Sequence, residues 1–223
     1  MTRADRWSTQ VAVSRRGDRL VAALPDAVTA AFFLTLWIAP LAFGLHGVRN
    51  AMLVMLVEFV LIHATGGFGA SVFREDLTRA KRFAFLFGTS LFYLLFVSTF
   101  ALIFEAWWPF LAFAWLLVGK LAMAVDPRRT STERRVAMQR RWVQTAIVYL
   151  LGVFATVILP LPRLGITADV TPHLGLTGSG LWIEQPHTVI AFGTLYFGVL
   201  AALGARQAMA AAEVPRNPRD DAG

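Results

Sequence analysis

The chain has 223 residues, of which 57% are hydrophobic and only 16% are charged. A soluble domain is usually about 45–50% apolar, so this composition argues against a soluble globular protein and predicts a membrane protein. The net charge of +7 comes from arginines and lysines that lie between apolar segments, so we expect no nucleic-acid partner. The chain has no cysteine, which excludes disulfides, iron–sulfur clusters and thiolate zinc sites within it.

Six apolar segments are long enough, or nearly so, to cross a bilayer as helices, since a crossing takes about 20 residues. The fourth is the weakest, because its uninterrupted apolar run stops at Gly119. We predict an all-α fold, a six-transmembrane-helix bundle over residues 27–205. In chain order the predicted spans are 27–45, 51–73, 83–104, 107–125, 142–161 and 188–205.

Lysine and arginine are distributed unevenly between the predicted spans. All but two of the 21 fall in segment 1–26, in the loop after the second span, in the segment from Lys120 to Arg141, or in the tail 206–223. Six crossings place those regions on one side and leave only Arg49 and Arg163 on the other. Because cytoplasmic loops are enriched in lysine and arginine, we expect both termini in the cytoplasm of a bacterial inner membrane. The tail is expected to be disordered.

The fifth helix is expected to begin before its membrane span. Thr130 and Glu133 have the spacing of a capping box, which predicts a helix start in the cytoplasm. Four arginines then lie at the inner headgroups, where each basic residue contributes about 1 kcal/mol of attraction to anionic lipid. These predicted lipid contacts are Arg134, Arg135, Arg140 and Arg141.

The second span, 51–73, contains Glu58 and His63 within an otherwise apolar run. An ionisable side chain near the centre of a bilayer costs at least ~2.5 kcal/mol, so other groups of the protein must satisfy it. Being five residues apart, the two side chains project about 140° from each other around a helix. Counting depth along upright helices places Trp37, Tyr93, Trp115 and Tyr196 near His63, and Ser98, Thr99 and Thr156 near Glu58.

Three interpretations of Glu58 and His63 remain open. Both can be neutral and hydrogen-bonded, holding the helices in register at about 0.6 kcal/mol for each interhelical bond. They can instead form a proton or cation relay, in which a buried carboxyl and an imidazole titrate near neutral pH. Haem ligation by His63 requires a second histidine at the same depth, and the sequence offers none, so haem is not expected.

The remaining histidines are predicted on the outer side, together with several carboxylates. Imidazole and carboxylate ligands suit zinc, copper or iron, but no compact motif such as HExxH is present. Pro186 also explains two of these residues as an ordinary helix start. The long outer loop, 162–187, exceeds a usual connection and is therefore a candidate for function. The candidate metal ligands are His46, His173, Glu184 and His187.

The function expected from these observations is proton or ion handling through Glu58 and His63 by an inner-membrane protein whose biochemical role the sequence does not specify. One alternative is a non-catalytic membrane scaffold or accessory subunit, and another is an outer-face metal-binding protein or metalloenzyme. The sequence contains no phosphate-binding glycine loop and no GxSxG elbow, so an enzyme is not favoured. No cofactor is strongly implied.

Overall fold

The computed structural model describes residues 23–72, 78–125 and 132–210, and every regular element within these ranges is helical. Four of the helices described there contain stretches long and apolar enough to cross a membrane: Gly47–Gly69, Phe83–Ile103, Met138–Ile158 and Pro186–Gln207. A shorter apolar helix, Ala23–Ile38, precedes them. The elements that follow it are α2 (Gly47–Val72), α3 (Arg79–Ile103), α4 (Trp108–Val125), α5 (Thr132–Ile158), η2 (Thr171–Leu174), α6 (Leu181–Glu184) and α7 (Pro186–Ala210).

Helix ends differ from the predicted span ends where proline intervenes. The first helix ends at Ile38 rather than continuing to residue 45, because Pro40 lacks the amide hydrogen that a helix needs and disfavours helical geometry at the preceding residue. Helix α7 begins at Pro186, where the fixed φ of proline suits a first helical position. Helix α5 begins at Thr132, before its predicted membrane span, as expected. Thr130 of the predicted capping box lies outside the described residues.

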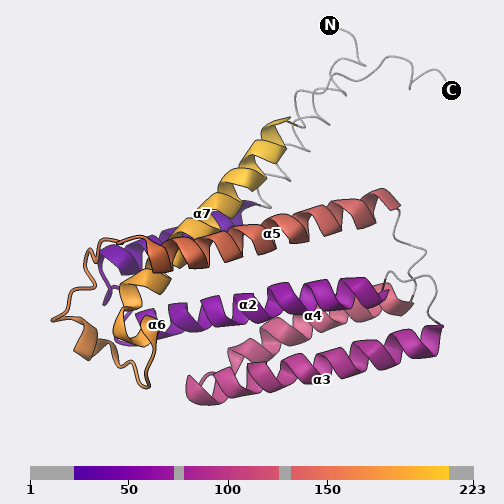
Figure 1. The fold of residues 1–223 in the computed structure, drawn as a ribbon, viewed down its shortest axis with the longest axis horizontal. Coiled ribbons are helices and arrows are strands. Elements are labelled where there is room, and N and C mark those ends of the chain that lie inside the picture. Colours follow the sequence, from indigo (N-terminus) through magenta and orange to yellow (C-terminus); the bar gives the residue numbers. More distant parts are fainter. Residues whose placement is uncertain (1–22, 73–77, 126–131, 211–223) are drawn as a thin grey trace, which may run out of the picture.

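Helix α2 occupies the centre of the bundle and packs against α3, α4, α5 and α7. Figure 1 shows α2 to α5 lying side by side, while α7 runs obliquely to them next to α5. Two aromatic donors of α5 bond to backbone carbonyls of α2: Trp142 Nε1 to Ile62 O, and the Tyr149 hydroxyl to Met55 O, both at 2.8 Å. The two donors are seven residues apart in α5, and the two acceptors are seven residues apart in α2. Together the two bonds set the register of this antiparallel pair of helices.

Glycines allow aromatic rings to approach neighbouring helices closely. A Cβ placed on Gly66 of α2 would lie 2.5 Å from the Trp142 ring, and one on Gly152 of α5 would lie 2.6 Å from the Phe192 ring. A Cβ on Gly193 would overlap the ring of Phe33. Close packing at small residues is how helices associate in lipid, where the solvent supplies no hydrophobic driving force.

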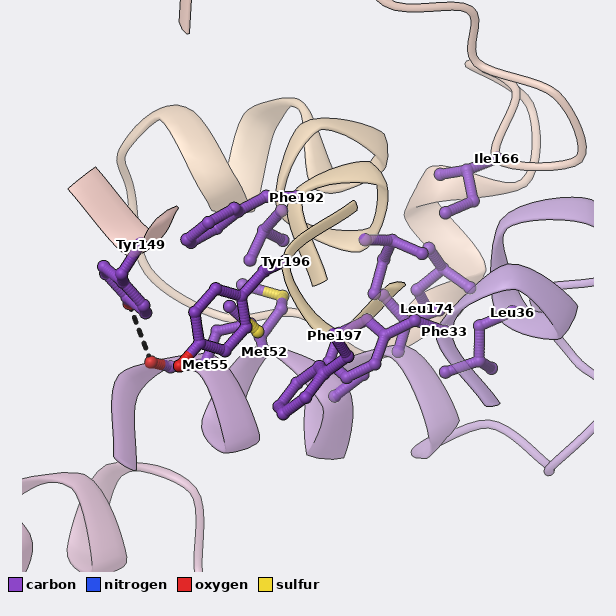
Figure 2. Close-up of a cluster of buried hydrophobic side chains, with 14 of the residues drawn as sticks. Phe33, Leu36, Met52, Met55, Tyr149, Ile166, Leu174, Phe192, Tyr196 and Phe197 are labelled. Atoms are coloured by element: carbon purple, nitrogen blue, oxygen red, sulfur yellow. Dashed lines mark hydrogen bonds between the residues drawn. The ribbon is translucent and has the colours of Figure 1, made fainter. Parts of the chain in front are cut away.

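The predicted outer loop folds back onto the end of the bundle. Its residues Ile166 and Leu174 are fully buried in the same cluster as Phe33 and Leu36 of the first helix (Figure 2). Trp37 Nε1 donates to Pro162 O at 2.9 Å, and its own carbonyl accepts from the amide of Gly165 at 3.0 Å. The connection is thus an integral part of the core.

Candidate functional site

Glu58 faces the interior of the bundle and is held by α7. The hydroxyl of Tyr196 donates to Glu58 Oε1 at 2.6 Å. The other carboxylate oxygen, Oε2, makes no hydrogen bond to the part of the chain that the structure describes. Tyr196 packs edge-on against Tyr149, with 5.3 Å between ring centroids, and both belong to the aromatic cluster drawn in Figure 2. One oxygen of Glu58 is therefore fixed, while the other is available to a further partner.

Glu58 lines a cavity of about 350 Å³ between the first helix, α2, α5 and α7. Its other polar walls come from Asp26 of the first helix and from residues near the beginning of α5 and the end of α7. The remaining lining residues are apolar or glycine. The complete lining is Ala23, Asp26, Glu58, Arg141, Gln144, Thr145, Leu200, Leu203, Gly204 and Gln207.

Asp26 and Arg141 make the cavity electrostatically mixed. Asp26 lies just before the predicted first span; burial raises the pKa of its carboxyl, and the charge of Arg141 acts in the opposite direction and lowers it. Asp26 and Glu58 are near enough for their charges to interact. The cavity therefore combines two carboxyls from different helices with one guanidinium.

An aromatic cluster lies next to Glu58, which it contacts through Tyr196. In this cluster the side chains of Met52, Phe192 and Tyr196 are at most 2% exposed, and Phe33 is fully buried. Figure 2 shows these side chains meeting between α2 and α7. The cavity that Glu58 lines lies in the half of the bundle where the first helix begins and α7 ends.

His63 lies on a different face of α2 from Glu58. Its side chain is exposed, its ring stacks 4.1 Å from that of Phe59, and Nδ1 lies 2.8 Å from the Phe59 carbonyl. His63 is not among the residues that line the cavity. The structure therefore does not join the two ionisable groups of the second span into one site.

The four candidate metal ligands of the outer side also remain separate. Among the described residues, no group of three histidine, aspartate or glutamate side chains lies close enough to hold a metal ion. His187 is buried in the first turn of α7, whereas His46, His173 and Glu184 are exposed. Glu184 Oε1 accepts instead from the Gly180 amide at 3.4 Å, within its own helical turn.

The arginines predicted at the lipid headgroups have different surroundings. Arg140 and Arg141 have exposed side chains, but Arg141 also lines the cavity. Arg135 is half-buried, and the side chain of Arg134 lies outside the described residues. Arg141, which the sequence predicted as a lipid contact, is therefore also a component of the site.

Sequence reasoning missed Asp26 and Arg141 as cavity residues, and the groups that it matched in depth to Glu58 did not include Tyr196. Depth counting placed Tyr196 near His63, but Tyr196 bonds to Glu58 because α7 is oblique to α2 (Figure 1). One signal was available for Asp26, a carboxylate directly beside an apolar segment in a chain with few acidic residues.

Comparison with known proteins adds no assignment. No protein-family model, no curated protein and no solved structure matches the chain.

Proposed function

We propose that the chain is a six-span inner-membrane protein, with both termini in the cytoplasm, that moves protons or small cations across the membrane by way of Glu58, which takes them up from the cytoplasmic side. The observation that carries this proposal is a carboxylate that lines a partly polar cavity, with one oxygen fixed by Tyr196 and the other unbonded within the described residues. Burying a carboxylate within a membrane-spanning bundle costs free energy, so such groups are usually paired and often mark functional sites.

The cytoplasmic assignment of the cavity rests on the charge distribution. The cavity lies toward the beginning of α5 and the end of α7, next to segments that carry most of the lysine and arginine. His63 has no part in this proposal, because it neither lines the cavity nor contacts Glu58. The predicted relay is thus reduced to Glu58 and its cavity partners.

Proton flux into proteoliposomes tests the proposal. The full chain is reconstituted around a pH-sensitive dye, a potassium diffusion potential is imposed, and acidification of the lumen is followed. We expect the wild-type protein to exceed protein-free liposomes and Glu58→Gln to abolish the excess. Two controls, His63→Ala and Glu105→Gln, are expected to retain it, since both residues are exposed and lie away from the cavity.

Wild-type flux equal to that of protein-free liposomes, or a Glu58→Gln variant as active as wild type, contradicts proton handling. A non-catalytic scaffold is then the better interpretation. The specific observations in its favour are the paired bonds from Trp142 and Tyr149 to backbone carbonyls of α2 and the close contact of Gly66 with Trp142. These contacts fix the packing without requiring a ligand.

A further inference from the structure

We infer that the cavity between the first helix, α2, α5 and α7 is a binding site for a small organic ammonium compound, whose nitrogen is held by Asp26 and Glu58. This inference deepens the proposed function and rests on it, because it uses the same carboxylate. It adds the chemical class of the ligand and assigns roles to Asp26 and Arg141.

The size and walls of the cavity favour an organic ligand over a bare ion. Ligand pockets are usually about 300–1,000 Å³ and combine apolar walls with a few polar groups. This cavity, of about 350 Å³, is at the small end of that range, and Leu200, Leu203 and Ala23 provide apolar walls. A metal ion alone would leave most of the space to water, and the described residues contain no three-ligand metal group.

The polar groups favour an ammonium as the charged part. A primary ammonium has three donors and no acceptor, and the cavity offers acceptors from three helices. Glu58 contributes the oxygen Oε2, which has no hydrogen bond within the described residues, and Asp26 contributes a second carboxylate. Gln144 and Thr145 of α5 add side-chain oxygens. Hydrogen bonds to charged groups are about twice as strong as those between neutral groups.

Arg141 gives the site a polarity that discriminates between ligands. Its guanidinium lies near Asp26 and repels a plain amine, but it attracts the carboxylate of a zwitterion whose amine points toward Glu58. Removing this charge should therefore change the affinities for an amine and for an amino acid in opposite directions. A site without this arrangement of charges is not expected to change the two affinities in opposite directions.

Calorimetric titration of the full chain in lipid nanodiscs tests the inference with three probes of similar size: butylamine, 4-aminobutyrate and butyrate. We expect wild-type protein to bind butylamine and 4-aminobutyrate but not butyrate. Asp26→Asn and Glu58→Gln should each weaken butylamine binding at least tenfold, which corresponds to about 1.4 kcal/mol. Glu105→Gln, an exposed carboxylate outside the cavity, should leave binding unchanged.

Arg141→Gln tests whether Arg141 acts on the ligand through its charge, because a purely structural role of Arg141 would not change the two affinities in opposite directions. It should strengthen butylamine binding and weaken 4-aminobutyrate binding. The inference is overturned if wild-type protein binds neither amine, if Glu58→Gln binds butylamine as wild type does, or if Arg141→Gln shifts both affinities in the same direction.

The two proposals fail in different experiments. Proton flux that depends on Glu58, without amine binding, removes the ammonium site and leaves the proposed function. Amine binding that depends on Glu58, without proton flux, removes proton handling and leaves a cation-binding cavity. Each measurement therefore decides its own proposal.

Discussion

At the scale of single residues, the feature that distinguishes this bundle is the hydrogen bond from Tyr196 to Glu58. Its length of 2.6 Å lies within the usual range of an O–H···O hydrogen bond. It joins α7 to the central helix and orients the carboxylate toward the cavity. Because the bond is interhelical, its contribution can be measured through stability as well as through binding.

Replacing Tyr196 by phenylalanine removes this hydroxyl and keeps the ring. We expect the free energy of unfolding to fall by about 0.6 kcal/mol, and by no more than about 1.7, the range measured for interhelical bonds in membranes. Unfolding in mixed micelles with increasing denaturing detergent measures this loss.

Tyr93→Phe is the matched control, because the Tyr93 hydroxyl has no hydrogen bond within the described part of the chain. A double-mutant cycle with Glu58→Gln isolates the pair. A loss for Tyr196→Phe no larger than that for Tyr93→Phe means that the bond contributes nothing.

At the scale of helices, contacts between glycines and aromatic rings determine how closely the elements approach. Gly66 lies against Trp142, and Gly193 lies against Phe33. The glycine cluster Gly66, Gly67 and Gly69 in the sequence suggests close packing but does not show which member is in contact. In the structure, Gly66 meets Trp142, while a Cβ on Gly69 would meet nothing within 4 Å.

Gly66→Ala should therefore destabilise the protein, because the new methyl group overlaps the Trp142 ring and displaces its bond to Ile62. Overpacking costs about 1–3 kcal/mol. Detergent-induced unfolding and tryptophan fluorescence both report the change.

Gly69→Ala is the control one helical turn away, and it should be neutral or slightly stabilising because alanine favours a helix by about 1 kcal/mol over glycine. Equal losses for the two variants contradict the packing of Trp142 on α2.

The outer connection can be tested in the same way. Leu174→Ala should cost about 2–5 kcal/mol and make the loop sensitive to protease, because Leu174 is fully buried in the core cluster. Leu181→Ala, on a side chain that is 40% exposed in the same connection, should have little effect. Protease resistance of the Leu174→Ala variant at the wild-type level contradicts burial of the loop.

At the scale of the whole molecule, successive helices from α2 to α5 are antiparallel, with α7 completing the bundle (Figure 1). The expected all-helical fold is confirmed in the described part of the chain, as are four helices suited to cross a membrane. The six-span count and the cytoplasmic position of both termini remain predictions that rest on the distribution of lysine and arginine.

The absence of cysteine makes topology directly measurable. A single cysteine at Ser179, in the outer connection, should react with a membrane-impermeant maleimide in intact cells. A single cysteine at Ser8 should react only after the membrane is opened. The reverse pattern means that the orientation is inverted. Labelling of both sites in intact cells contradicts the odd number of crossings, five, that the six-span prediction places between them.

The sequence by itself determined the class of protein, the helical segments and the importance of the second span, because composition, segment length and charge placement are properties of the chain alone. It also predicted that Glu58 and His63 point apart, since helical geometry follows from their spacing. Only the tertiary structure decided which groups meet Glu58. Apolar helices have no polar face to orient them, and depth counting assumes upright helices, whereas oblique α7 brings Tyr196 to Glu58 and encloses the cavity with Asp26 and Arg141.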